Sequence, residues 1–331
     1  MEPEITSRFT EAIEVEAFRR YAIPRNTVRK IDAFESFVYE FARAGARYIL
    51  RVGHTLHRSV AAVHAELDWI EHLARCGADV ARPIPSASGA LVEVIADDRS
   101  GHFLATAFAY APGEKPRDAA HVRSIAEAYG QAIGRMHALT KDYAPSDPVC
   151  ARPHILDDIE RHVRQWLPTA HEMCLDRFNV LIAHLRCLPA GRDAYGLVHG
   201  DAHRWNFHVD RRGIPRFFDF DDCGVSWFAY DLAVIVYCSV AESDPPDVVE
   251  KYLVRFFRGY ARENALDWSW LLEIPRFLKL REIYDYTAIH RSLDVEDLSE
   301  PWASFMHGRK QRIERGAPVL HVDFSALAEL L

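Results

Sequence analysis

The hydrophobic pattern divides the chain into a strand-rich beginning and a helix-rich remainder. Apolar-rich runs such as SFVYEFA and RYILRVG alternate with turn residues, and Gly45 between them predicts a hairpin. NTVRKIDAF, ALVEVIA and HFLATAFAY predict further strands. SVAAVHAELDWIEHLARCG predicts a helix that ends at Gly77, a residue suited to a helix C-terminus. We therefore expect an opening helix and a small antiparallel sheet with one inserted helix in residues 1–108.

Longer helical patterns dominate the rest of the chain, and a strand-rich block at residues 195–221 interrupts them. The predicted helices cover residues 118–140, 154–188, 228–241, 246–264 and 268–291. The segment YAPGEKP, with Pro112, Gly113 and Pro116, has the composition of a hinge. The pattern predicts an α+β protein with a sheet-based N-lobe at 1–108, a hinge at 109–116 and a mainly helical C-lobe at 117–331.

Composition narrows the class of protein. The chain has 331 residues, with 40 Lys and Arg against 48 Asp and Glu, and its formal charge of −8 argues against nucleic acid as a partner. The acidic N-terminus lacks the basic start and apolar core of a signal peptide, and no apolar run is long enough for a membrane span. We therefore expect a cytoplasmic protein with no membrane partner. The six cysteines are scattered without a CxxC pair, which indicates free thiols.

The block at 195–221 concentrates polar groups that can do chemistry. A strand YGLV leads into the loop HGDAHRWN, which carries Asp201 and Asn206, and RFFDFDD predicts a later strand. In that strand Asp219 and Asp221 fall on one face, where two carboxylates repel each other unless a positive group lies between them. A divalent metal satisfies this need, and oxygen ligands favour magnesium over zinc. The alternative is a solvated edge strand with alternating acids.

Two histidines in the same loop permit a different interpretation. His199 and His203 are four residues apart, the spacing of zinc ligands on a helix, which would indicate a metal-dependent hydrolase. Gly200 lies between a strand and a loop, however, and argues against a helix here. The other interpretation is structural: His199 packs under the loop and His203 braces it.

The motif H-G-D-x-H-x-x-N at residues 199–206, followed by D-F-D at 219–221, resembles the catalytic core of the aminoglycoside phosphotransferase and choline kinase superfamily. The resemblance implies a protein-kinase-like fold and phosphoryl transfer from ATP. It implies that Asp201 is the catalytic base and that Asn206 and Asp219 hold magnesium on the phosphates. Asp221 is then a further metal contact. For Asp231 the resemblance implies structural support, because in this fold the aspartate accepts hydrogen bonds from the backbone of the catalytic loop. The alternative is an ordinary carboxylate near a helix N-terminus.

The N-lobe offers a further feature of a kinase. Glu66 lies on the apolar stripe of the helix at 59–76, where an unpaired charge is costly. Arg51, on the preceding strand, is the expected partner, and by resemblance this pair grips the phosphates of ATP. The alternative is that Glu66 flanks the stripe and reaches water. Many relatives have Lys at the position of Arg51, and Arg offers a planar fork instead of a point charge.

Other ATP contacts follow from the resemblance alone. KIDAFESFVYEF lacks the glycines of a phosphate loop, so Ser36 and the backbone of residues 35–37 would cover the phosphates. AFAYAPG resembles the connector whose backbone meets the purine, which assigns that contact to Ala109 and Ala111 with Phe108 and Tyr110 beside them. The alternative for these aromatic side chains is packing in the core.

The acceptor is a hydroxyl-bearing small molecule in our first hypothesis, and the kind of small molecule stays open: amino alcohol, amino acid, sugar or aminoglycoside. By resemblance its pocket involves Asp222, Trp227, Tyr230, Arg281, Tyr284 and Asp285. The acids and aromatics suit an amino-bearing acceptor, whereas Arg281 suits a carboxylate. The sequence DFDDCG resembles the corresponding segment in the branch of the superfamily that contains homoserine-kinase-like enzymes and a bacterial stress-response kinase. The second hypothesis is a protein Ser/Thr kinase or a nucleotide-binding pseudokinase that acts through partners.

Overall fold

The computed structural model describes residues 3–33, 35–149, 151–241 and 243–331. The chain forms two compact units, and each is described by itself. The first unit contains Met1–Pro112 and takes in two later segments, Tyr143–Arg152 and Arg216–Asp221. The second unit contains Gly113–Asp142, Pro153–Pro215 and Asp222–Leu331. Phe34 and Cys150, which fall in the predicted phosphate loop and among the predicted free thiols, lie outside the described residues.

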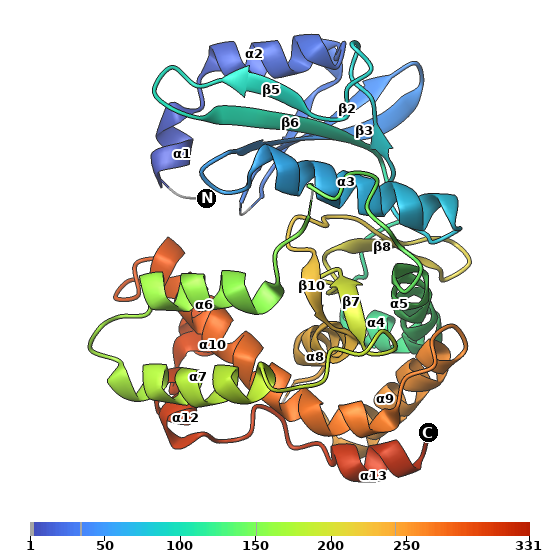
Figure 1. Ribbon diagram of the computed structural model, residues 1–331, viewed down its shortest axis with the longest axis vertical. Helices are drawn as coiled ribbons and strands as arrows, with labels where there is room; N and C mark the ends of the chain where they lie inside the picture. Colours follow the sequence, from blue (N-terminus) through green and yellow to red (C-terminus); the bar gives the residue numbers. More distant parts are fainter. Residues whose placement is uncertain (1–2, 34, 150, 242) are drawn as a thin grey trace. The chain divides into compact units, whose positions relative to one another are not determined.

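An antiparallel sheet forms the centre of the first unit, as predicted (Figure 1). Its strands are β1 (Arg29–Ile31), β2 (Phe37–Arg43), β3 (Ala46–His54), β4 (Pro83–Ile84), β5 (Glu93–Ala96) and β6 (His102–Ala109). They lie in the order β1-β2-β3-β6-β4, and β5 also pairs with β6. The predicted hairpin between β2 and β3 is confirmed: Ala44 and Gly45 turn the chain with φ angles of 50° and 80°.

Helices cover both faces of this sheet (Figure 1). The first unit contains the helices α1 (Pro3–Arg8), α2 (Glu11–Arg20) and α3 (Val60–Arg75) and the short 3-10 helix η1 (Arg25–Thr27). Phe18 of α2 packs with Tyr39 and Phe103 in the core on one face. Arg51 points to the other face because neighbouring strand residues alternate, and α3 covers that face. The predicted inserted helix is therefore confirmed.

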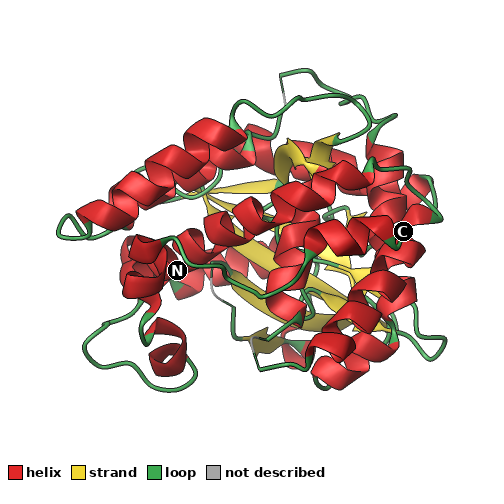
Figure 2. Ribbon diagram, turned by 90° about the horizontal axis from the view of Figure 1, so that it is seen from below, coloured by secondary structure: helices red, strands yellow, loops and turns green. Residues whose placement is uncertain are grey.

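The second unit is mainly helical. In Figure 2, which colours the whole chain by secondary structure, red helices predominate over yellow strands. Its helices are α4 (Ala119–Ser124), α5 (Ala126–Thr140), α6 (Ile155–Trp166), α7 (Glu172–Leu185), α8 (Phe228–Ser239), α9 (Pro246–Ala261), η2 (Trp268–Glu273), α10 (Ile274–Ser292), α11 (Trp302–Met306), α12 (Arg309–Arg315) and α13 (Phe324–Glu329). Strand β7 (Tyr195–Val198) pairs antiparallel with β10 (Gly224–Trp227), and β8 (Phe207–Val209) is a further strand of this unit. Strand β9 (Pro215–Phe217) lies mostly in the segment Arg216–Asp221 of the first unit. The α8 helix is almost entirely apolar and buried, so it forms the core of the unit.

Several predicted elements need correction. The strand predicted for RFFDFDD is wrong after Phe217: Asp219 has a left-handed φ of 63°, so the chain turns there. Phe220 is buried against Trp69, with ring centroids 5.5 Å apart, and this packing overrides strand alternation. Asp219 and Asp221 therefore do not share a strand face. The predicted helix 154–188 is in fact α6 and α7, with Pro168 in the break.

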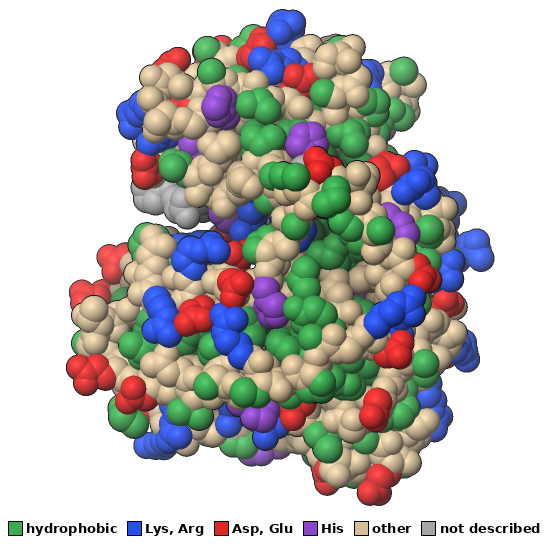
Figure 3. Space-filling view, viewed as in Figure 1, with side chains coloured by type: hydrophobic (Ala, Val, Ile, Leu, Met, Phe, Trp, Pro, Cys, Tyr) green, Lys and Arg blue, Asp and Glu red, His purple; other side chains and the backbone are tan. Residues whose placement is uncertain are grey.

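The surface carries mixed charge. On the face shown in Figure 3, acidic and basic side chains are interspersed and do not gather in one patch of a single sign. Among the described residues, none of the helices is both long and apolar enough to cross a membrane.

Candidate active site

The loop after β7 is held by the buried side chain of Asp231. The N–H groups of His199 and Gly200 donate to its two carboxylate oxygens at 2.9 and 2.8 Å, and His137 Nε2 lies 3.2 Å from it. Gly200 has a φ of 82°, and a Cβ there would lie 2.2 Å from the carbonyl oxygen of Asp222. Only glycine fits this close approach, so glycine is required at the start of this loop.

The carboxylate of Asp201 is surrounded by donors from its own loop and from α10. Asn206 Nδ2 donates at 2.9 Å to Oδ2, and His203 Nε2 lies 3.2 Å from the same oxygen. Arg281 Nη1 lies 2.9 Å from Oδ1. Burial raises the pKa of Asp201, but Arg281 and then His203 outweigh burial, and the pKa is below its ordinary value. Asp201 is therefore ionised at neutral pH.

Arg281 joins Asp201 to a second carboxylate. Its Nε lies 2.9 Å from Oδ1 of Asp285, one turn later on α10, and its side chain is only 11% exposed. The guanidinium carbon lies 5.7 Å from the ring centre of Tyr284. Burial raises the pKa of Asp285 in spite of Arg281. One cation thus serves two half-buried carboxylates, a contact that sequence reasoning did not anticipate.

In the first unit, the expected ion pair between Arg51 and Glu66 is present. Arg51 Nη2 donates to Glu66 Oε2 at 2.7 Å, and Glu66 is completely buried, so the alternative in which Glu66 reaches water is wrong. The Arg51 guanidinium also lies 5.2 Å from the ring centre of Phe108. Arg51 Nη1 reaches within 3.6 Å of Asp221 Oδ1. The pair therefore connects β3, α3 and the segment that carries Asp221.

Two residues that the sequence analysis missed lie at Asp221. His57 Nε2 is 3.1 Å from its Oδ2 and 3.2 Å from Glu35 Oε2, and Arg58 Nε is 3.5 Å from Oδ2. Burial lowers the pKa of His57, but its hydrogen bonds with Asp221 and Glu35 raise it to about 10. Burial likewise raises the pKa of Asp221, but Arg58, His57 and Arg51 bring it well below its ordinary value. The signal for these residues was the basic pair in HTLHR directly after β3.

The remaining predicted ATP contacts are placed as follows. The N–H of Ala109 donates to the carbonyl of Arg82 at 2.8 Å, and that of Tyr110 donates to the carbonyl of Arg47 at 3.1 Å. The Arg47 guanidinium stacks over the Tyr110 ring at 3.7 Å. Ala111 is buried, and Ser36 lines a small cavity together with Arg51. Any purine contact by Ala109 must therefore use its carbonyl.

The residues predicted to form the acceptor pocket do not all lie near Asp201. Trp227 is buried and donates from Nε1 to the carbonyl of Pro189 at 2.9 Å, an arrangement that serves the core. Tyr230 is buried as well, and its pKa is raised by burial. The structure therefore brings Arg281 and Asp285 to Asp201, whereas Trp227 is engaged elsewhere.

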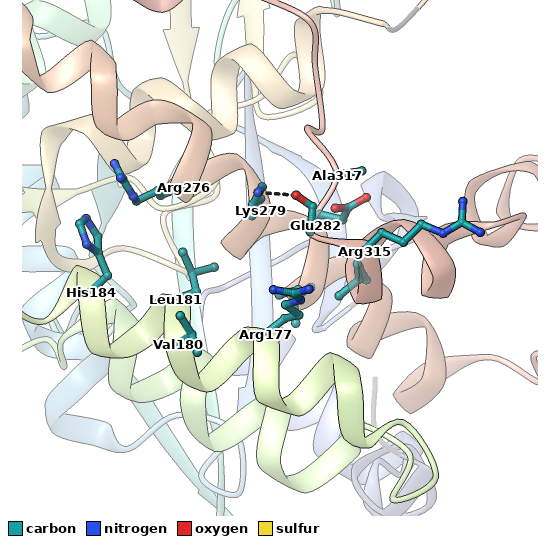
Figure 4. Close-up of a pocket in the computed structure, with 12 residues that line it drawn as sticks. Arg177, Val180, Leu181, His184, Arg276, Lys279, Glu282, Arg315 and Ala317 are labelled. Atoms are coloured by element: carbon teal, nitrogen blue, oxygen red, sulfur yellow. Dashed lines mark hydrogen bonds between the residues drawn. The ribbon is translucent and has the colours of Figure 1, made fainter.

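A cavity of about 340 Å³ in the second unit lies between α7, α10 and the end of α12 (Figure 4). None of the predicted site residues lines it. Lys279 Nζ donates to the carbonyl of Gly316 at 2.8 Å and Arg177 Nε donates to that of Glu314 at 2.9 Å. These basic groups thus satisfy carbonyls at the C-terminal end of α12. On α10, Lys279 and Ile283 lie on the face opposite Arg281, so this cavity is separate from the Asp201 site.

The loop with Asp201 and Asn206 and the Arg51–Glu66 pair together are the features of a phosphotransferase with a kinase-like fold. Comparison with known proteins agrees: residues 27–272 match the family model described as "Phosphotransferase enzyme family", and the chain belongs to this family.

Two individual relatives extend along nearly the whole chain. The chain is 35% identical over 322 residues to amicoumacin kinase of Bacillus subtilis (strain 168), covering 96% of each protein. It is also similar to the solved structure of "Amicoumacin kinase hAmiN in complex with AMP-PNP, Ca2+ and Ami", with a TM-score of 0.92, 33% identity and coverage of 99% of this chain and 100% of the other. A microcompartment-associated aminopropanol kinase, at 21% identity and a TM-score of 0.73 over 92% of this chain and 97% of the other, shares the fold.

These findings confirm the superfamily, the fold class and the function class predicted from the motif. The chain is a small-molecule phosphotransferase, and the hypothesis of a metal-dependent hydrolase falls away. The roles assigned to individual residues stay predictions.

Proposed function

We propose that the chain transfers the γ-phosphoryl group of ATP, with magnesium, to a hydroxyl group of amicoumacin or a close analogue. The observation that carries this proposal is the 35% identity to amicoumacin kinase over 96% of both proteins. The solved relative that contains AMP-PNP, Ca2+ and Ami supports a nucleotide and a divalent cation as ligands.

Asp201 is the base in this proposal. Its carboxylate is ionised, and the hydrogen bonds of His199 and Gly200 to Asp231 hold the backbone just before it, so it can accept a hydrogen bond from the acceptor hydroxyl and then its proton. The hydroxyl oxygen forms the new bond to the γ-phosphorus while the bond to the β-phosphate oxygen breaks, and ADP leaves. Asn206 and Arg281 hold the carboxylate in place during this step.

Asn206 and Asp219 are the proposed magnesium ligands. Asn206 uses its Nδ2 to donate to Asp201, which leaves its amide oxygen as the atom for a metal, and Asp219 supplies a carboxylate. Both are the oxygen donors that magnesium prefers. When bound, magnesium neutralises charge on the transferred phosphate. Arg51, oriented by Glu66, would grip the phosphates, and the connector with Ala109, Tyr110 and Ala111 would meet the purine.

The acceptor in this proposal carries an amino group. Arg281 already pairs with both Asp201 and Asp285, so a carboxylate on the acceptor would have to compete with two protein carboxylates for it. The carboxylate of Asp285 and the ring of Tyr284 suit an ammonium group instead. This argues for amino-bearing alcohols over amino acids such as homoserine.

The test is an acceptor screen by mass spectrometry. The purified chain is incubated with magnesium-ATP and, separately, amicoumacin, aminopropanol, choline, spectinomycin, homoserine or a generic protein substrate. We expect a phosphorylated product with amicoumacin, and product with the protein substrate alone would contradict the proposal. Asp201→Asn should lose on the order of 10² to 10⁴-fold in kcat and retain nucleotide binding. Asp176→Asn, exposed on α7, is the control that should turn over normally.

A further inference from the structure

In the connection between β3 and α3, two backbone N–H groups donate to one carbonyl. The N–H groups of His57 and Arg58 both donate to the carbonyl of His54, at 2.9 and 3.1 Å. Ser59 then begins α3 by accepting the N–H of Ala62 on its hydroxyl at 3.1 Å. These bonds determine where the His57 and Arg58 side chains leave the backbone.

Both side chains turn toward the same carboxylate that Arg51 approaches. His57, Arg58 and Arg51 lie 3.1, 3.5 and 3.6 Å from the Asp221 carboxylate, and the side chains of His57 and Arg58 are each 15% exposed. All three also line the small cavity that contains Ser36 and Gly53. Basic groups therefore converge on one side of the sheet, next to the Arg51–Glu66 pair.

This cluster suits an anion better than a metal ion. Glu35, His57 and Asp221 have ligand atoms within 4.8 Å of one another, a spacing that would fit a cation if they stood alone. Arg58 and Arg51 approach the same carboxylate, however, and their fixed positive charges would repel a cation there. Phosphate oxygens, by contrast, can take the place of a carboxylate oxygen beside Arg and His side chains.

We propose that His57 and Arg58 bind the phosphate chain of the nucleotide together with Arg51, with Asp221 and Glu35 serving as their counter-ions in the nucleotide-free protein. This inference rests on the proposed function. The segment KIDAFESFVYEF lacks glycine, so it offers a poorer backbone cradle for phosphates than a glycine-rich loop does. The basic side chains after β3 would bind the phosphates in place of such a backbone cradle. Asp221, in consequence, orients these cations and is not a magnesium ligand.

The experiment compares His57→Gln, Arg58→Gln and the double variant with two matched controls. His64→Gln and Arg75→Gln make the same changes at exposed positions of α3. The dissociation constants of ATP, AMP-PNP and adenosine are measured by calorimetry, and KM is measured for ATP and for the acceptor. We expect each site variant to weaken ATP and AMP-PNP by about 10-fold, with adenosine binding and the KM of the acceptor unchanged. Arg58→Lys should recover part of the loss, because it restores the charge without the planar fork.

The outcomes separate this inference from the proposed function. ATP affinity equal to that of the controls overturns the inference, and so does a lower melting temperature with unchanged ATP affinity, which would mean a purely structural role. If the unaltered chain binds ATP and phosphorylates its acceptor while the site variants bind ATP normally, only this inference fails. If the unaltered chain does not bind ATP, the proposed function fails first.

Discussion

Arg281 joins two carboxylates whose pKa values move in opposite directions. The pKa of Asp201 is lowered, because Arg281 and His203 outweigh its burial, whereas that of Asp285 is raised by burial in spite of the same arginine. A base that only orients a hydroxyl and receives its proton late does not need a raised pKa. At the residue scale, we therefore propose that Arg281 acts through Asp201 as a positioning residue.

Removing this arginine should damage catalysis more than nucleotide binding. Arg281→Gln leaves Asp201 and Asp285 without their shared cation, so we expect kcat to fall on the order of 100-fold with the KM for ATP unchanged. The acid limb of the kcat profile should move to higher pH, because the pKa of Asp201 is no longer lowered by the guanidinium. Arg276→Gln, on the opposite face of α10 and paired with Glu273, should match the unaltered enzyme. An unchanged pH profile in Arg281→Gln would refute the positioning role.

We expect the buried ring of His54 to make the stability of the first unit sensitive to acid. Its ring is buried, its Nδ1 accepts the N–H of Leu56 at 3.0 Å, and burial lowers its pKa despite Asp97 at 3.3 Å. The folded state resists a proton that the unfolded chain binds near pH 6.5. This contribution is complete above that pH and is lost as the pH falls, by at most about 1.4 kcal/mol per pH unit.

Urea unfolding at about pH 7 and about pH 5 measures this effect. The free energy of unfolding should decrease less on acidification in His54→Gln than in the unaltered chain. His64→Gln, an exposed histidine of α3, should behave like the unaltered chain. Equal acid sensitivity of His54→Gln and the unaltered chain would exclude His54 as the source.

At the element scale, α5 and α9 touch backbone to backbone. A Cβ on Gly130 of α5 would lie 1.8 Å from the carbonyl oxygen of Phe256, and one on Gly259 of α9 would lie 2.0 Å from that of Glu127. Glycine at these positions is therefore required by the crossing of two helices. The α5 helix also carries His137, whose Nε2 lies 3.2 Å from the Asp231 carboxylate that accepts the N–H groups of His199 and Gly200. The close crossing of α5 and α9 therefore helps to position His137 against Asp231.

Gly130→Ala should force the two helices apart. Overpacking of this kind costs about 1–3 kcal/mol, and we expect a loss at the upper end because the obstructing atom belongs to the backbone. Gly191→Ala is the matched control, since a Cβ there meets no atom within 4 Å. Thermal unfolding measures both variants, and equal melting temperatures would contradict the close crossing.

At the scale of the whole molecule, nucleotide binding should stabilise the folded chain. A ligand at 100 times its dissociation constant adds about 2.7 kcal/mol to the free energy of unfolding. Magnesium with AMP-PNP should therefore raise the melting temperature, and Asp219→Ala should lose most of the rise, because it removes a proposed metal ligand. Asp176→Asn should keep the full rise. No rise at millimolar nucleotide would contradict the kinase activity.

Local pattern was a good guide to part of this molecule. The hairpin at Gly45, the helix that follows β3 and the inward position of Glu66 could be predicted because strand alternation and helix periodicity act over a few residues. The choice of Arg51 as the partner of Glu66 also drew on the resemblance to kinases. The strand predicted at Asp219 is wrong for a tertiary reason. Phe220 packs against Trp69 on α3, and the left-handed backbone of Asp219 turns the chain in front of it.

The sequence by itself determined the class of protein and the loop with Asp201 and Asn206, because these residues lie close together in one short motif. Only the tertiary structure decided that Arg281 pairs with Asp201, and that His57 and Arg58 gather with Arg51 at Asp221. The physical reason is that such pairs join residues far apart in the chain. Burial makes an unpaired charge costly, but it does not say which distant partner the folded chain will supply.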